Sequence, residues 1–532
     1  MPQQSMPEFI EDLEKINQLR RVAGPVRIDE IPSLMEGCKD KALLVEKIKD
    51  YDFPFLAGAY STREQYAAAL DCDKREIPAK LVDIISRRIK PVTVDTAPCK
   101  EVILQGDDVD LTTFPLFLHH EYDGNAYIQD SNVVSRHPES GLINWGMYRL
   151  MYRNRNETNV DMRNDSHNSR IIAREYLKRG VDMPVAIVIG GPTLDKIASM
   201  YSFPGVDDWD ILGGFYGEPA KVVKCETNDL TVPANAEIVL EGRIITSEGW
   251  IYDEGPYGEF SGTYGGGLPK NCRLLIDCIT HRKNSVFQHA TIGGMQPGLT
   301  DMQVMNIAIE AEIMKAMKNA GLDVLDIYMP PGGCLNILYA RLRVKAAGDA
   351  KQALAVILSS SRQWFPKIAY VFDEDIDIFD DNRVKWALAW RFHPAKGTLI
   401  IPDLNIVPLD PIAGVDHPPV NLPKIGFDCT VPLIGVYDEF AFEAAKIMQP
   451  LGEPRADVKI KTEEELTKEM SDYIKESPRT WREIITHFHG QPNPLIYRAF
   501  GNIRNKLGRL ADRRPDYPYT FADTWFVYEN KE

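Results

Sequence analysis

The sequence lacks the features that define several whole classes of protein. Its eight cysteines are scattered along 532 residues and form no Cys-x-x-Cys pair, so we expect free thiols in a reducing compartment rather than a disulfide framework. No apolar run approaches the roughly 20 residues that span a bilayer. The N-terminal residues lack the basic and apolar regions of a signal peptide. These absences predict a cytoplasmic protein without a membrane partner.

An excess of positive charge is also missing. The formal net charge is −16, which argues against nucleic-acid binding because that function needs a basic surface. The apolar content of 44% and the charged content of 26% are ordinary for a globular protein. The chain is longer than one core can fill, and it contains no internal repeat, so we expect two to four domains.

Hydrophobic periodicity divides the chain into four regions. Residues 1–114 alternate helical patterns with short apolar segments, which indicates an α/β domain. Residues 115–299 are rich in β-branched segments separated by Gly, Pro and Asn, which predicts a closed or partly closed β-barrel. Residues 300–451 begin with a helix and then alternate strands and helices, as in a second α/β domain. Residues 452–532 form a C-terminal extension, a polar helix followed by an arginine-rich segment. The predicted fold class is α/β (α+β).

The helix that opens the third region is predicted from its capping and spacing. Thr300 to Gln303 has the form of a capping box, and Gly321 supplies a stop. Apolar side chains recur along one side, and a methionine stripe of this kind is more typical of core packing than of a cofactor contact. The stripe consists of Met302, Met305, Ile309, Ile313 and Met317. We expect this helix to connect two domains.

The most informative segment is Glu254-Gly255-Pro256-Tyr257-Gly258-Glu259. In a regular strand, a spacing of five residues would send the two carboxylates to opposite faces. Gly255-Pro256 and Gly258 permit a tight turn instead, so both carboxyl groups can converge on one pocket. Paired carboxyls tend to have their pKa values pushed apart, which suits one of them to deliver a proton. The alternative is a surface turn with two solvated glutamates.

Upstream residues offer further chemistry. Asn144, His167 and Asp208 supply an amide oxygen, an imidazole and a carboxylate, donors that suit a borderline divalent ion such as Mn²⁺ or Fe²⁺. Their spacing alone establishes no site, because any chain of this length contains such residues. Arg149 lies in an alternating segment and is also compatible with an outward-facing position at a strand edge.

Several separated motifs, taken in order, resemble one enzyme family. They are Asn144 to Arg149, His167, Gly205 to Asp208, Val223 to Gly242 and Glu254 to Glu259. Together they resemble the UbiD family of decarboxylases, which use prenylated FMN, over roughly residues 90 to 430. The resemblance implies a split β-barrel that binds the flavin in residues 115–299. It also implies that the α/β domain in residues 300–451 forms the oligomer interface.

The resemblance also implies roles for the site residues. Arg149 and Glu254 would provide positioning and charge balance, and Glu259 would donate the proton. Asn144, His167 and Asp208 would hold the divalent ion that anchors the flavin phosphate. The family usually has Glu where this chain has Asp208, which leaves Asp207 as a fallback ligand.

Further cofactor contacts are implied by the same match. A K⁺ ion would be bound mainly through backbone carbonyls of Ala198 to Met200, and Lys424 would reach the flavin phosphate. The complete set implied for cofactor binding is Asn144, Trp145, Met147, Tyr148, Arg149, Ser166, His167, Ser199, Met200, Asp208 and Lys424.

The function implied by the resemblance is reversible non-oxidative decarboxylation of an aromatic or α,β-unsaturated carboxylic acid through a covalent prenylated-FMN adduct. A UbiX-type flavin prenyltransferase would supply the cofactor, and the chain would form a homo-oligomer, a dimer or a hexamer. Arginines in the tail, among them Arg498, Arg504, Arg509 and Arg513, are compatible with a coenzyme A thioester such as phthaloyl-CoA. They are equally compatible with packing on a neighbouring subunit.

Two other functions stay open on the sequence. One is an accessory, non-catalytic subunit of a multisubunit carboxylase, although Arg149 and Glu259 are both present. The other is a metal-dependent hydrolase that uses Asn144, His167 and Asp208 with a metal-bound water. His119 and His120 precede the β-rich segments, and no motif assigns them a role.

Overall fold

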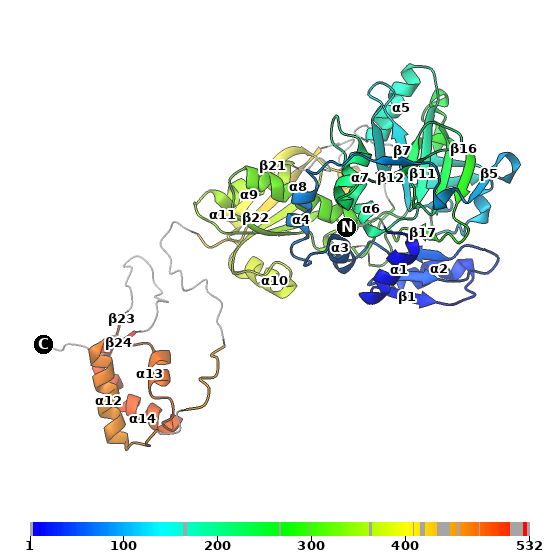
Figure 1. The fold of residues 1–532 in the computed structure, drawn as a ribbon. Helices are drawn as coiled ribbons and strands as arrows, with labels where there is room; N and C mark the ends of the chain where they lie inside the picture. Colours follow the sequence, from blue (N-terminus) through cyan, green and yellow to red (C-terminus); the bar gives the residue numbers. More distant parts are fainter. Residues whose placement is uncertain are drawn as a thin grey trace. The chain divides into compact units, whose positions relative to one another are not determined.

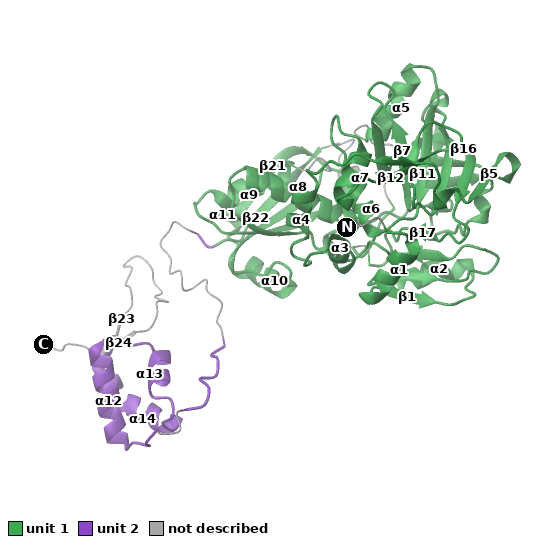
Figure 2. Cartoon of the chain, in the orientation of Figure 1, with its two compact units in different colours: residues 1–430 green, residues 431–532 purple. Residues whose placement is uncertain are grey.

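The chain forms two compact units, residues 1–430 and 431–532 (Figure 2). The computed structural model describes residues 4–162, 167–264, 268–296, 298–360, 364–407, 409–414, 421–432, 447–454, 458–477, 479–510 and 525–528. Within these ranges, no helix is long and apolar enough to cross a bilayer. Short 3-10 turns occur at η1 (Ile28–Glu30), η2 (Pro98–Lys100), η3 (Gly106–Asp108), η4 (Leu111–Thr113), η5 (Thr246–Glu248), η6 (Pro331–Gly333), η7 (Pro411–Gly414) and η9 (Arg504–Lys506).

The N-terminal region builds a small sheet flanked by helices (Figure 1). Its elements are α1 (Met6–Lys15), β1 (Leu19–Val22), α2 (Ile31–Glu36), β2 (Ala42–Val45), β3 (Phe55–Ala57), α3 (Arg63–Leu70) and α4 (Ile77–Ile84). The sheet order is β1-β2-β3-β17, and β17 (Phe287–His289) comes from far along the chain and pairs in parallel with β3. The N-terminal region is therefore joined to the central region by a shared sheet.

The central region contains a ten-stranded antiparallel sheet. Its main path runs β6-β9-β10-β16-β14-β11-β7-β8, and β5 and β15 pair with the long strand β16. The strands are β5 (Val102–Gln105), β6 (Tyr127–Ile128), β7 (Ser131–Arg136), β8 (Ile143–Met147), β9 (Leu150–Asn154), β10 (Glu157–Val160), β11 (Met183–Ile189), β14 (Ile238–Ile244), β15 (Tyr252–Asp253) and β16 (Lys270–His281).

Two residues join opposite ends of this sheet. Strand β8 is last in the path and β9 is second, yet only Tyr148 and Arg149 separate them. Three steps of extended chain cover at most about 11 Å, so the sheet must curl until its ends lie close together. Among the described residues β6 and β8 do not pair. The partly closed, split barrel is confirmed, and the closed alternative is wrong.

Helices and a small sheet complete the central region. They are α5 (Asn168–Lys178), α6 (Thr193–Ala198) and α7 (Asp208–Tyr216), with the three-stranded sheet of β13 (Thr231–Pro233), β12 (Lys221–Lys224) and β4 (Val92–Val94) in that order. Three residues separate the end of strand β11 from the start of helix α6. Helix α7 begins at Asp208, a residue predicted to bind metal, and its N-cap Asp207 accepts the N–H of Ile143 on β8. The start of each helix is therefore close to a strand of the curled sheet.

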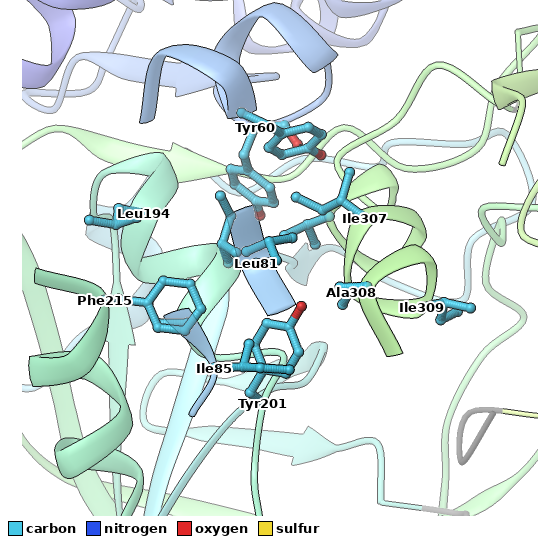
Figure 3. Packing of buried hydrophobic residues seen from close by; sticks show 14 of the residues in the cluster. Tyr60, Leu81, Ile85, Leu194, Tyr201, Phe215, Ile307, Ala308 and Ile309 are labelled. Carbon is cyan, nitrogen blue, oxygen red and sulfur yellow. The ribbon is translucent and has the colours of Figure 1, made fainter. Parts of the chain in front are cut away.

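Helix α8 (Gln303–Asn319) is the connector that the sequence predicted. It is apolar nearly all round and packs on α4 and on the helices of the central region. Figure 3 shows this packing around Tyr60, Leu81, Ile85, Leu194, Tyr201, Phe215, Ile307, Ala308 and Ile309. The predicted capping box is wrong: α8 begins at Gln303, two residues later than the box requires, and the Gln303 side chain donates to the carbonyl of Gly298 (2.8 Å) instead of to the N–H of Thr300.

The region after α8 is the predicted second α/β layer. A five-stranded sheet runs β18-β19-β20-β22-β21, with parallel pairing in its centre and antiparallel pairing at both edges. Its elements are β18 (Val324–Tyr328), β19 (Ile337–Leu342), α9 (Asp349–Ser360), β20 (Ile368–Asp373), α10 (Asp381–Trp390), α11 (Pro394–Gly397), β21 (Thr398–Asn405) and β22 (Asn421–Asp428).

The second unit has its own apolar core, which includes Leu466, Met470, Ile484 and Ile496. Its elements are α12 (Glu463–Glu476), α13 (Trp481–His487), α14 (Asn493–Ile503) and the hairpin of β23 (Leu507–Leu510) and β24 (Trp525–Tyr528). Arg498 forms an ion pair with Glu463 within this unit.

Glu310 supports a test of how the connector helix is held. This residue of α8 is fully buried, and it accepts hydrogen bonds from Arg63 (2.9 Å) and from the backbone N–H of Met329 (2.8 Å). Glu310→Ala should reduce the free energy of unfolding by about 3–5 kcal/mol, because it leaves a largely buried guanidinium without its carboxylate. Urea unfolding measures the loss. Glu374→Ala, which removes the half-exposed partner of Arg343, should cost less than about 1 kcal/mol. Equal losses would contradict this account.

Candidate active site

One buried arginine joins the two carboxylates of the glutamate turn. Arg149 lies at the junction of β8 and β9. Its Nε and Nη2 donate to the two oxygens of Glu254 (2.8 and 3.0 Å), and its Nη1 donates to Glu259 (2.7 Å). Glu254 is 1% exposed and Glu259 is 3% exposed. The structure thus brings together the three residues predicted as a network, and the turn is not a solvated surface loop.

Two further contacts fix the guanidinium. Its Nη2 lies 3.2 Å from a carboxylate oxygen of Asp161, and its Cζ lies 4.1 Å from the ring centre of Tyr257. Burial works to lower the pKa of Arg149, but the carboxylates of Asp161, Glu259 and Glu254 outweigh it and raise that pKa well above its ordinary value. Arg149 is therefore a permanent cation among three carboxylates.

The loop before β6 holds the glutamate turn in place. The backbone N–H of Gly258 donates to Asp123 Oδ1 (2.8 Å), and the backbone N–H of Gly124 donates to the carbonyl of Pro256 (2.7 Å). Gly255 has a positive φ of 87°, a conformation that glycine adopts without strain. The turn is positioned by backbone contacts on both sides of Tyr257.

A cavity of about 350 Å³ opens on Glu259. Besides the Gly258-Glu259 segment, its lining includes Glu36, His119, His120, Tyr264 and Met295. The lining therefore combines three carboxyl groups, those of Glu36, Glu121 and Glu259, with aromatic rings, and among the described residues it includes no lysine or arginine. A planar, largely apolar acid suits such a space better than a polyanion does.

A second cavity, of about 360 Å³, is lined by most of the residues predicted to bind the cofactor. Those that line it are Asn144, Trp145, Met147, Tyr148, His167, Ser199 and Met200. They come from β8, from the start of α5 and from the end of α6. The curl of the sheet and the packing of α6 thus gather residues that lie up to 56 positions apart.

Four predicted residues lie elsewhere. Arg149 lies with the carboxylates, and Asp208 is buried behind Trp145, whose backbone N–H donates to it (2.7 Å). Lys424 Nζ donates to the carbonyl of Trp364 (2.8 Å), and burial lowers the pKa of this lysine to about 8. Ser166 is outside the described residues.

Sequence reasoning missed other residues that line the second cavity. Among them are Ile85, Phe203, Met305, Glu312 and Lys315. Met305 and Ile309 were assigned to core packing alone, yet α8 presents both to this cavity. The apolar residues of α8 carry no signal that distinguishes a core face from a cavity wall. Lys315 gives a weak signal, as a cation near the end of that helix.

The carboxylate of Asp208 and the side-chain amide of Asn144 are oxygen donors that suit a divalent metal ion. Asp208 Oδ1 is buried, and among the described residues it has no hydrogen-bond partner. Burial raises the pKa of Asp208 to about 7, against the N–H of Trp145, which lowers it. Asn144 uses its amide nitrogen to reach Ser169 (3.3 Å), so its carbonyl oxygen is turned to other partners. No cluster of three His, Cys, Asp or Glu occurs in the described ranges.

Asp207 does not serve as a fallback. Its Oδ1 accepts the N–H of Trp209 (3.0 Å) and its Oδ2 accepts the N–H of Ile143 (3.0 Å). These bonds cap helix α7 and tie it to strand β8. The carboxylate available to an ion is therefore that of Asp208.

Replacement of Arg149 should destabilise the fold in a pH-dependent way, because Arg149 balances the negative charge of the buried carboxylates. Arg149→Met leaves buried carboxylates without their shared cation, so we expect a loss of about 3–5 kcal/mol in unfolding free energy near neutral pH. The folded variant should bind protons more tightly than the unfolded chain does, so its stability should rise as the pH falls. Urea unfolding at two pH values measures both effects. Arg153→Met, on the same strand, is the control with a more exposed ion pair. A loss independent of pH would contradict the charge argument.

Comparison with known proteins gives a consistent assignment. Three family models match in succession: the 3-octaprenyl-4-hydroxybenzoate carboxy-lyase N-terminal domain over residues 10–85, its Rift-related domain over residues 90–296 and its C-terminal domain over residues 302–429. These are the UbiD models. The matched segments together span the first unit. A protein of Archaeoglobus fulgidus is 29% identical over 459 residues, which are 81% of this chain and 92% of that protein.

Solved structures agree with these matches. The UbiD-class enzyme HmfF from Pelotomaculum thermopropionicum, in complex with FMN, superposes with a TM-score of 0.76 at 29% identity, covering 84% of this chain and 97% of that one. Vanillic acid decarboxylase from Sedimentibacter hydroxybenzoicus gives 0.72 at 27%, covering 90% and 100%. The 3,4-dihydroxybenzoic acid decarboxylase of Enterobacter cloacae, at 21% identity, 0.75 and coverages of 85% and 98%, shares the fold.

Proposed function

The chain belongs to the UbiD family of carboxy-lyases, and we propose that it catalyses the reversible, non-oxidative decarboxylation of an aromatic or α,β-unsaturated carboxylic acid with prenylated FMN. The observation that carries this proposal is the Arg149–Glu254–Glu259 network beside two cavities. One cavity suits the cofactor and the other suits an acid. Glu259 is the residue that faces the acid.

The chain's own residues have separate tasks. Arg149 donates to both oxygens of Glu254, and this bidentate contact fixes the orientation of both groups. It contacts Glu259 through one nitrogen and so fixes the direction of that carboxyl. Glu259 would then deliver a proton to the carbon that has lost CO₂, or remove it in the reverse direction.

The second cavity fits a flavin that is anchored through its phosphate. When bound, prenylated FMN supplies the electron sink for loss of CO₂. Asn144, His167 and Asp208 would hold Mn²⁺ or Fe²⁺ there, and carbonyls near Ser199 and Met200 would hold K⁺. The buried, unpaired oxygen of Asp208 within the described residues supports this donor set.

A cation is also needed for the phosphate. Lys424 would have to leave the Trp364 carbonyl to reach it, whereas Lys315 already lines the cavity. Both lysines are therefore candidates. Cofactor supply by a UbiX-type prenyltransferase and assembly as a homo-oligomer, a dimer or a hexamer, complete the proposal.

A free aromatic acid is the substrate class that the first cavity supports best. Glu36 lines it together with Glu259, and the nearby Lys39 is paired with Glu36 (2.9 Å). A coenzyme A thioester such as phthaloyl-CoA would need cations for its phosphates. Of the tail arginines proposed for that task, Arg498 is paired within the second unit and Arg504 donates to the carbonyl of Leu507 (3.2 Å). The Arg509 side chain and Arg513 lie outside the described residues.

The spectrum of the bound cofactor tests the class of function. Protein produced together with the prenyltransferase should carry a flavin-like absorbance and release CO₂ from an aromatic acid. An accessory subunit would lack turnover, and a metal-dependent hydrolase would lack the flavin.

Glu259→Gln tests the proton donor. A neutral amide cannot deliver a proton, so decarboxylation, or H/D exchange at the product carbon, should fall by about 10²–10⁴-fold while the flavin stays bound. Glu248→Gln, a nearby carboxylate that pairs with Arg273, should keep normal rates. Near-normal exchange in Glu259→Gln would remove this residue from its role.

His167→Ala tests the metal bridge. The variant should lose divalent metal and retain less flavin, since the ion is proposed to connect protein and phosphate. Elemental analysis beside the absorbance spectrum measures both quantities, with His137→Ala as a surface control. Full flavin occupancy in metal-free His167→Ala would show that the ion does not hold the cofactor.

A further inference from the structure

His120 lies against the glutamate turn with both ring nitrogens buried. Among the described residues neither nitrogen has a hydrogen-bond partner. The ring stacks on His119 at 4.3 Å between centres and 9° between planes, and both rings line the cavity that opens on Glu259. A buried imidazole without partners is costly unless it has another use.

Two glycines leave room for this ring against the backbone of the glutamate turn. A Cβ on Gly258 would lie 2.2 Å from His120 Nδ1. A Cβ on Gly293 would lie 3.1 Å from His120 Nε2 and 2.6 Å from the backbone carbonyl oxygen of Glu259. Any other residue at either position would displace the ring. The glycines therefore hold a place for His120 beside the backbone of Gly258 and Glu259, at the edge of the cavity that the Glu259 side chain also lines.

Asp123 ties the ring and the turn together. Its Oδ1 accepts the N–H of Gly258 (2.8 Å), and its Oδ2 accepts the backbone N–H of His120 (2.9 Å) and lies 3.4 Å from Nδ1. The other titratable and charged groups that surround the ring are His119, His289, Tyr264, Glu259, Glu36, Glu121 and Lys39.

The neighbouring histidines cannot take the same role. Burial, followed by the influence of His120, lowers the pKa of His119 to about 3. Burial and the other two rings lower the pKa of His289 well below its ordinary value. Both are neutral at physiological pH and have no proton to give. Imidazole is otherwise the side chain that exchanges protons most readily near neutrality.

We propose that His120 is the proton relay that recharges Glu259 from the water in the 350 Å³ cavity. This inference rests on the proposed role of Glu259. After Glu259 has given its proton to the product carbon, the imidazolium of His120 gives its N–H proton to the carboxylate through water in the cavity that both residues line, and becomes neutral imidazole. A proton from solvent then restores the imidazolium through the same water, so each turnover takes up one proton from solvent and only protons move. In the reverse reaction the same proton leaves by the same route.

A substrate-free measurement tests the coupling. In protein labelled at histidine Cε1, the His120 signal is identified by its loss in His120→Gln. Its titration should move to lower pH in Glu259→Gln, because the variant lacks the carboxylate that favours the imidazolium. The His119 signal should not move. A His120 signal that ignores the change at Glu259 would overturn the relay whether or not the chain is a decarboxylase.

Kinetics of the holoenzyme test the relay in turnover, with 3,4-dihydroxybenzoate and vanillate as probes. His120→Gln should lower kcat by about tenfold to a hundredfold with little change in KM, and added imidazole should restore part of the rate. The decline of the wild-type rate at high pH should also disappear. His137→Gln, at a histidine that lines neither cavity, is the control and should keep the wild-type pH profile. A fold defect would instead lower the flavin absorbance and the melting temperature.

The two proposals fail in different ways. Normal kcat and a normal pH profile in His120→Gln would overturn the relay and leave the decarboxylase intact. If wild-type holoenzyme releases no CO₂ from either acid while the His120 titration still depends on Glu259, the choice of substrate class fails and the coupled proton pair stands.

Discussion

The site depends on one buried guanidinium. Removal of a charge from water is costly, and a lone arginine in the position of Arg149 would not be stable. Glu254, Glu259 and Asp161 offset that cost through hydrogen bonds at 2.7–3.2 Å. Arg149 is also one of two residues that join β8 to β9, where the ends of the curled sheet meet. The contact that balances the charge of the site therefore also closes the fold.

The two cavities are rigid because each is built from distant parts of the chain. The N-terminal region gives Glu36 to the first cavity and Ile85 to the second, and α8 gives Met305 and Lys315 to the second. Ile85 and α8 belong to the packed core that Figure 3 shows, and the helix that ends at Glu36 packs in a second core cluster through Ile31 and Met35. A side chain held by core packing keeps its orientation, which is what binding and proton transfer demand. The core and the site are thus one structure.

Features set by neighbouring residues in the sequence were predictable. Contacts between segments that are distant in the sequence were not. The convergence of Glu254 and Glu259 follows from the glycines and the proline between them. The packing of His120 between Gly258 and Gly293 depends on two loops meeting, and no local pattern encodes that. Thr300 and Gln303 fit a capping box by sequence, yet the Gln303 side chain donates to the carbonyl of Gly298 and α8 begins only at Gln303. A competing hydrogen bond to the preceding loop overrode local propensity there.

The start of helix α7 fixes the position of the Asp208 carboxylate. The capping bonds of Asp207 draw this helix onto β8, because one of them joins Asp207 to the N–H of Ile143. The N–H of Trp145 then binds one oxygen of Asp208, directly beside Asn144. The contacts that cap the helix therefore also hold the Asp208 carboxylate against the strand that carries Asn144.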